Sequence, residues 1–166
     1  MPKRNVFYSF HFEPDNWRVS KVRQMGVLEG NEPARDNDWE QVKQGGDKTI
    51  QNWIDGQMKG KSCAVVLVGK DTAGRKWIDY EIKKAWNDGK GVVGIHIHNL
   101  KDRNQRLAQK GKNPFGTFTM KRDNEKLSRI VKCYYVNSTD SKAVYNTIKN
   151  NIANWIEEAI KIRNEY

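Results

Sequence analysis

The sequence predicts an α/β fold with a mostly parallel sheet covered by helices on both faces. Apolar runs of strand length alternate along the chain with amphipathic segments of helix length. The run 64–68 is continuously apolar, which is typical of a central strand buried on both sides. Because 166 residues suffice for one core but not for two ordinary domains, we expect a single domain over residues 1–166.

The N-terminal part of the chain predicts a strand, a short helix and a second strand. Residues 5–10 are rich in β-branched and aromatic side chains, and Pro14 suits the first turn of the helix that follows. A brief strand is expected at 26–28. The stretch 29–46 is rich in Gly, Asn, Pro and Asp, so we expect a long loop there.

The middle of the chain predicts two helices and two strands. A helix is expected at 47–59, with Asp47 as its N-cap and Gly60 at its end. The central strand at 62–69 follows, and a second helix then ends near Gly89. Its apolar positions between residues 77 and 85 have helical spacing, and another strand is expected at 92–97.

The last third of the chain is irregular until its final helix. Residues 99–129 lack a sustained period and contain three helix-breaking residues, so a long irregular segment or insertion is expected there. A strand at 130–136 and an amphipathic helix at about 138–165 complete the domain.

The net charge of +10 is concentrated in this irregular part. Residues 101–132 hold ten Lys or Arg and three Asp or Glu, a local net charge of +7, with Phe115, Phe118 and Met120 among the charges. Basic and aromatic residues together make nucleic-acid binding an alternative. A solvated loop also explains the charge, and the motifs of common nucleic-acid modules are absent, so nucleic acid is the less favoured partner.

The sequence predicts a cytoplasmic protein without a membrane span. No apolar run reaches the length of a spanning helix, and no signal-peptide core precedes the first strand. Cys63 and Cys133 lie in apolar strand-like runs, so we expect two reduced, buried thiols without a catalytic role.

Ligands of open parallel sheets bind beyond the carboxyl ends of the strands, which directs attention to the segments after Phe10, Val68 and Ile97. The first strand is not followed by G-x-G-x-x-G, and the chain lacks a G-x-x-x-x-G-K-[ST] sequence. A Rossmann dinucleotide site and a P-loop hydrolase are therefore not expected.

Two groups of residues near this edge are candidates for chemistry. Ser9, Phe10 and His11 leave the first strand, either as an ordinary strand end or as part of a pocket. Trp77 and Glu81 are four residues apart, on one face of a helix near its N-terminal end. A Trp can stack on a base, and a carboxylate can bind ribose hydroxyls or stabilise an oxocarbenium ion. A partly buried Trp beside a solvated Glu is the structural alternative.

The pair His96 and His98 could bind a metal, but no Cys or carboxylate cluster of suitable spacing accompanies it, so no metal is expected. Ser9 is not in a G-x-S-x-G sequence, so a Ser/His/Asp triad is not expected either.

Taken together, the segments resemble bacterial TIR-like domains, in particular the ThsB type of Thoeris anti-phage systems. The resemblance covers residues 3–118. It rests on the order and spacing of five segments, which are Lys3–His11, Val65–Gly69, Arg75–Ile82, Gly94–His98 and Lys112–Phe115.

This resemblance implies a flavodoxin-like three-layer sandwich and an enzyme of the NAD glycohydrolase or ADP-ribosyl cyclase type. It makes Glu81 the catalytic glutamate, Trp77 a stacking residue beside it, and residues 9–11 the pocket lining, with 29–46 as a mobile loop over the pocket. NAD is then a substrate, with no further cofactor. The product is a nucleotide signal that activates an effector protein, and self-association is expected. The alternative is a non-enzymatic TIR-like interaction module that keeps Glu81 as a surface residue.

Overall fold

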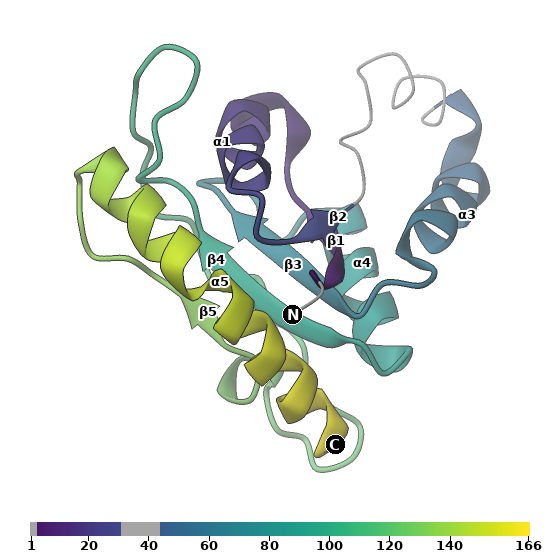
Figure 1. The fold of residues 1–166 in the computed structure, drawn as a ribbon. Coiled ribbons are helices and arrows are strands. Elements are labelled where there is room, and N and C mark those ends of the chain that lie inside the picture. Colours follow the sequence, from purple (N-terminus) through teal and green to yellow (C-terminus); the bar gives the residue numbers. More distant parts are fainter. Residues whose placement is uncertain (1–2, 31–43) are drawn as a thin grey trace.

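The structure is a computed structural model that describes residues 3–30 and 44–166. Its described strands form one parallel sheet in the order β2-β1-β3-β4-β5 (Figure 1). The strands are β1 (Asn5–Ser9), β2 (Glu29–Gly30), β3 (Cys63–Val68), β4 (Gly91–His96) and β5 (Cys133–Tyr134). This order is that of flavodoxin-like folds, so the predicted fold class is confirmed.

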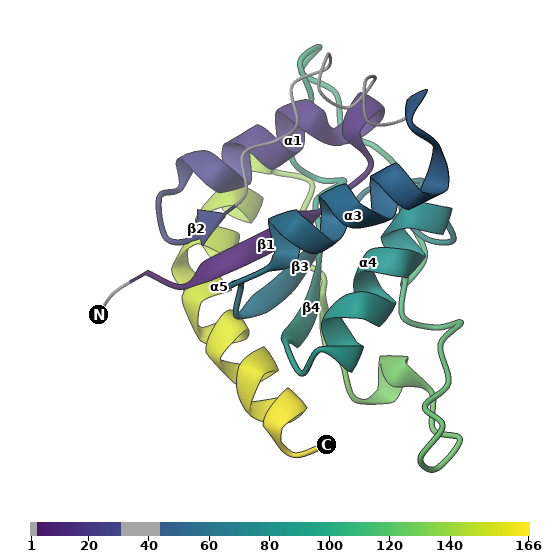
Figure 2. The ribbon, with the colours of Figure 1, turned by 90° about the vertical axis from the view of Figure 1, so that its right-hand side faces the viewer.

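Helices cover both faces of this sheet (Figure 2). The described helices are α1 (Phe12–Gln24), α3 (Gly46–Met58), α4 (Lys76–Asn87) and α5 (Ser141–Asn164), with a short 3-10 helix at Leu127–Arg129. We call the side covered by α1 and α5 the α5 face, and the side covered by α3 and α4 the α4 face. No helix among the described residues is long and apolar enough to cross a bilayer.

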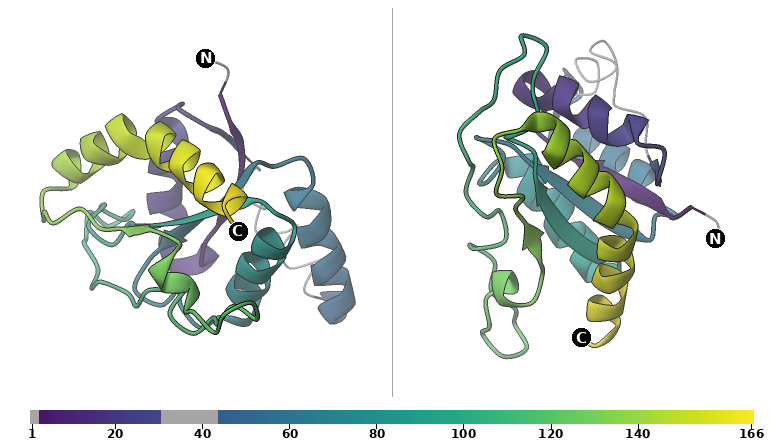
Figure 3. Two further views of the ribbon diagram at one scale, coloured as in Figure 1. Left: turned by 90° about the horizontal axis from the view of Figure 1, so that it is seen from below. Right: turned by 60° about the vertical axis from the view of Figure 1, so that its left-hand side comes forward.

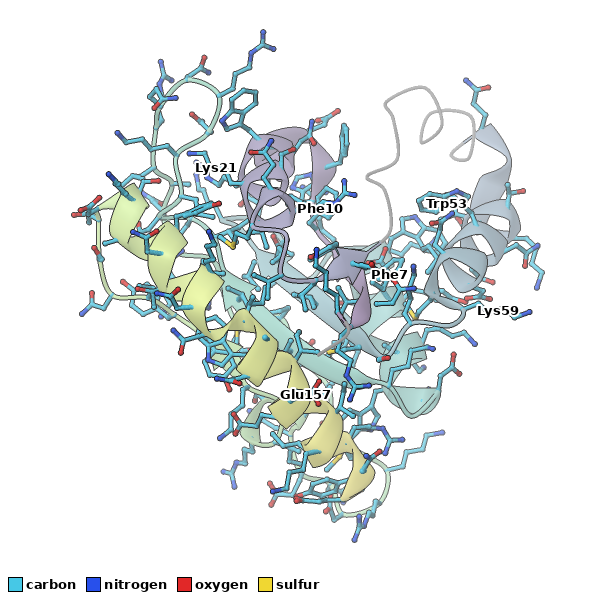
Figure 4. The ribbon with its side chains drawn as sticks, in the orientation of Figure 1. Phe7, Phe10, Lys21, Trp53, Lys59 and Glu157 are labelled. Atoms are coloured by element: carbon cyan, nitrogen blue, oxygen red, sulfur yellow. The ribbon has the colours of Figure 1, made fainter. Side chains whose placement is uncertain are left out.

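Each face has its own hydrophobic core, because successive residues of a strand point to opposite sides. On β1, Val6 and Tyr8 pack on the α5 face, whereas Phe7 packs on the α4 face with Ile54 and Ile82. Figure 4 shows Phe7 on β1 and Trp53 on α3, and Trp53 packs against this second core. All six residues of β3 are buried, as expected for the central strand.

Several element boundaries differ from those predicted. The second strand is at Glu29–Gly30, not at 26–28, because Gly26 adopts a left-handed conformation (φ 70°) just after α1. Helix α3 begins at Gly46 after Gly45, so Asp47 is not its N-cap. Asp47 lies in the first turn and pairs with Lys76 of α4. Of the predicted loop 29–46, residues 31–43 lie outside the described part.

The C-terminal elements are shorter than predicted. Of the strand expected at 130–136, only Cys133 and Tyr134 pair, with Gly94 and Ile95 of β4. Helix α5 begins at Ser141 instead of 138, because the Asp140 side chain caps it by accepting hydrogen bonds from the backbone N–H groups of Lys142 and Ala143.

The connection between β4 and β5 is the irregular segment that the sequence predicts. It runs from the carboxyl end of β4 to the amino end of β5 (Figure 3), and its described secondary structure is one 3-10 helix and one isolated bridge between Thr119 and Lys126. Phe115, Leu127 and Val131 from this segment pack into the α4-face core, where a crossover helix is usual. Phe115 is fully buried, so it is not available to stack on a nucleic-acid base.

Candidate active site

Glu81 lies on the side of α4 that packs against the sheet. Its neighbours Ile78, Ile82 and Ala85 are buried on the same helix, and Glu81 itself is only 9% exposed. Ser9, at the carboxyl end of β1, is 1% exposed and follows Phe7 on the same face of the sheet. The alternative in which Glu81 is a solvated surface residue is therefore wrong.

Burial determines the protonation state of Glu81. Loss of hydration raises the pKa of the Glu81 carboxyl to about 8, and the neighbouring Ser9 hydroxyl opposes this rise. Neither Glu81 Oε2 nor Ser9 Oγ has a hydrogen-bond partner of normal geometry among the described residues. Buried polar atoms without partners are uncommon in folded proteins, and a carboxyl with a strongly raised pKa marks a candidate reactive site.

Trp77 lies one helical turn before Glu81, as the sequence predicts, in the first turn of α4. Its half-buried ring packs against the α4-face core and contacts Tyr80 edge-on, with ring centroids 5.7 Å apart. Lys76 Nζ lies 5.0 Å from the Trp77 ring centroid. Tyr80 donates a 2.7 Å hydrogen bond to Asp55 of α3, and this bond links α4 to α3.

Phe10 and His11 follow Ser9 but face different surroundings. The Phe10 ring packs against the α5-face core, and its centroid lies 6.2 Å from that of the Phe12 ring. His11 is half-buried and holds the N-cap position of α1. The structure therefore brings Ser9 together with Glu81, and places the Phe10 ring on the α1 side of the strand end.

A buried ion pair that the sequence analysis did not single out supports the neighbouring loops. Asp15 and Arg18 of α1 are 2% and 3% exposed, and their Oδ1 and Nη1 atoms are 3.2 Å apart. Arg18 also donates hydrogen bonds to the backbone carbonyls of Leu100 and Arg106. In the sequence this pair looks like an ordinary exposed i,i+3 pair, because its burial depends on a loop more than eighty residues away.

The two histidines of the H-x-H pair lie at the carboxyl end of β4. They are 5% and 4% exposed, and each contacts the ring of Tyr135. No group of three or more metal-binding side chains occurs within the described ranges.

The two cysteines are free thiols. Cys63 is buried and Cys133 is half-buried, and burial raises the pKa of each thiol to about 12.

A family model described as "Thoeris protein ThsB, TIR-like domain" matches residues 7–102, which is more than half of the chain. The chain belongs to the ThsB TIR-like family. The match runs from β1 past the end of β4, so it contains Ser9, Glu81 and the two histidines of this ThsB-like domain.

A relative in Bacillus cereus (strain MSX-D12) carries the name "Putative cyclic ADP-D-ribose synthase ThsB1". The two proteins are 37% identical over 120 residues, which is 69% of this ThsB-like chain. The match spans 62% of the length of the relative, which is less than two thirds of it.

Proposed function

We propose that this ThsB-like chain cleaves NAD at the nicotinamide–ribose bond and converts the ADP-ribosyl group into a nucleotide signal for an effector in anti-phage defence. The observation that carries this proposal is the buried Glu81 carboxyl beside Ser9 at the carboxyl edge of the sheet, whose Oε2 atom has no hydrogen-bond partner within residues 3–30 and 44–166. The name of the Bacillus cereus relative supports the same chemistry and favours cyclisation as its outcome.

The site would promote bond cleavage by electrostatic stabilisation. The bond between the ribose anomeric carbon and the nicotinamide nitrogen breaks, and its electron pair leaves with neutral nicotinamide. The positive charge then develops on the ribosyl carbon and its ring oxygen. A Glu81 carboxylate in a dry pocket stabilises that charge much more strongly than a solvated carboxylate does.

Substrate binding would also supply the charged form of Glu81. Burial keeps the Glu81 carboxyl mostly protonated at neutral pH, because it raises the pKa of this group to about 8. The nicotinamide ring of NAD is cationic, and a cation near a carboxyl lowers its pKa. Binding of NAD therefore favours loss of the Glu81 proton to solvent.

Capture of the ribosyl carbon completes the reaction. Water gives ADP-ribose and releases one proton, whereas an internal nucleophile of the ADP-ribosyl group gives a cyclic product. Glu81 can accept the proton in either case.

Trp77, one turn away, would line the pocket by stacking, while Ser9 would contact the ribose. The segment 9–11 would form the pocket edge, with NAD as a substrate and no metal required.

Substitution of Glu81 tests the proposal. Concentrated protein is incubated with NAD, nicotinamide release is followed by chromatography, and the nucleotide products are identified by mass spectrometry. Because a preorganised charge is worth about 10²–10³-fold in rate, Glu81→Gln should lower nicotinamide release by at least that factor. Glu157→Gln is the matched control, because Glu157 is an exposed residue of α5 on the other face (Figure 4).

Full activity of folded Glu81→Gln protein would overturn the assignment. The assay should cover a range of protein concentrations, because the resemblance to TIR-like domains implies self-association. If nicotinamide release is absent at every concentration while the chain binds another protein, the non-enzymatic interaction module is the better description.

A further inference from the structure

The carboxyl end of β4 carries a second group of polar side chains, which we call the histidine–tyrosine cluster. It consists of His96, His98, Tyr135 and Lys110. The His98 ring stacks on Tyr135 with a centroid distance of 5.5 Å and an interplanar angle of 13°. His96 meets both other rings edge-on, at 5.7 Å from His98 and 6.0 Å from Tyr135. Lys110 Nζ lies 4.1 Å from the Tyr135 ring centroid.

The described residues leave both histidines of this cluster with an unpartnered ring nitrogen. In each ring this nitrogen is the buried Nδ1 atom. Within the same ranges, no carboxylate forms an ion pair with Lys110. Tyr135 is 42% exposed, so one side of the cluster is open to solvent.

The electrostatic surroundings of the cluster are positive. Burial and the nearby Lys110 charge lower the pKa of His96 to about 4. Burial, Lys110 and Arg18 also lower the pKa of His98. Both imidazoles are therefore neutral at pH 7, and each has one N–H donor. A lysine ammonium beside two imidazole donors favours an oxyanion and disfavours a metal cation.

The cluster lies on the same face and edge of the sheet as Glu81. Ser9 pairs in register with Val66, and His96 pairs with Val68, two strands away from β1. Strands are about 4.8 Å apart and advance about 3.3 Å per residue, so the Cα atoms of Ser9 and His96 are about 12 Å apart. One dinucleotide with two ribosyl groups joined by a pyrophosphate can reach both places.

We propose that the histidine–tyrosine cluster binds the pyrophosphate of the dinucleotide whose ribosyl carbon reacts beside Glu81. This assignment rests on the proposed function for the identity of the ligand. Lys110 supplies the charge, His96 and His98 supply hydrogen bonds, and Tyr135 holds Lys110 and His98 in place. Lys110 and Tyr135 lie beyond residue 102, so the family match does not include them.

The test measures binding without turnover. Glu81→Gln protein is titrated with ADP-ribose, with inorganic pyrophosphate and with adenosine, while the imidazole signals of His96 and His98 are followed by NMR. ADP-ribose and pyrophosphate should shift both sets of signals, and adenosine should not. Lys110→Ala should weaken ADP-ribose binding about tenfold, since a lost charged contact is worth about 1.4 kcal/mol. Lys112→Ala is the matched control, because Lys112 is an exposed lysine in the same loop.

Two results would overturn the inference. One is that ADP-ribose binds without shifting the histidine signals, and that its affinity is the same in the Lys110→Ala and Lys112→Ala variants. The other is pyrophosphate binding without ADP-ribose binding, which would indicate a free-anion site. Neither result depends on nicotinamide release, so the cluster and the proposed function can fail separately.

Discussion

Burial of Glu81 carries a cost in stability that depends on pH. The folded-state pKa of about 8 is above the ordinary value of 4.5, so the folded protein holds one more proton than the unfolded chain between these values. Stability then decreases as pH rises through this window, because ionisation is favoured in the unfolded chain. A carboxyl held in this way is suited to respond to a cationic ligand.

Glu81→Gln should remove this pH dependence. Gln has no carboxyl to ionise, so the variant should gain thermal stability over the wild type as pH rises from 5 to 9. Each kcal/mol corresponds to about 2–4 °C in a chain of this size, so a difference of several degrees is expected at pH 9. Differential scanning fluorimetry of both proteins across this range measures it. If the difference in melting temperature between the two proteins is the same at all pH values, ionisation of Glu81 does not destabilise the folded protein.

At the same scale, the sequence predicted which residues to examine but not their protonation or orientation. The spacing of Trp77 and Glu81 placed both on one helix face, and the structure confirms this. The spacing could not show that the Glu81 carboxyl is buried, because that depends on how closely α4 packs on β3 and β4. Alternation along β1 explains why Ser9 faces Glu81 and the Phe10 ring does not.

At the scale of elements, helices with a clear apolar stripe were predicted most accurately. The expected helices near α3, α4 and α5 are present, with shifts of one to three residues at their starts. The short edge strands were predicted less well. Their position depends on pairing with β1 and β4, and a two-residue strand has no period to recognise.

The segment after β4 is held against the end of β3 by a close backbone contact. An added Cβ at Gly111 would collide with the carbonyl oxygen of Gly69 and lie 3.0 Å from that of Lys70. Gly116 in the same segment has its nearest atom at 3.5 Å, which is ordinary contact. Glycine is therefore required at the first position and not at the second.

Gly111→Ala should destabilise the fold by about 1–3 kcal/mol, because backbone atoms must move to admit the methyl group. Gly116→Ala should change stability by less than about 0.5 kcal/mol. Urea unfolding of both variants measures the difference. Equal free energies of unfolding for the two variants would mean that the backbone at Gly111 does not pack closely against the end of β3.

At the scale of the whole molecule, the parallel sheet and its helical layers followed from the alternation of apolar runs and amphipathic segments. The strand order did not follow from that pattern, because the sequence does not reveal on which side of β1 the chain continues. The structure shows that β3 pairs with the opposite side of β1 from β2, which puts Ser9, Glu81 and the histidine–tyrosine cluster along one edge.

The net charge of +10 predicts nonspecific attraction to polyanions. The chain should be retained on duplex DNA at low salt and released near 0.15 M salt, where the Debye length is about 8 Å. Reversal of the charges of exposed Lys121, Arg122 and Lys126 should lower this retention and leave nicotinamide release unchanged. Electrophoretic mobility shifts at several salt concentrations measure it. Tight, sequence-dependent binding at 0.15 M salt would favour the nucleic-acid alternative instead.

The helix-free connection between β4 and β5 has a practical consequence for labelling the protein. Phe115 and Leu127 anchor the two sides of its tip, and the Thr119–Lys126 bridge closes them together. Residues 121–124 between these anchors are all exposed. An epitope or fluorophore inserted between Arg122 and Asp123 would therefore extend into solvent, away from the sheet edge that carries Glu81, and allow the protein to be followed in cells.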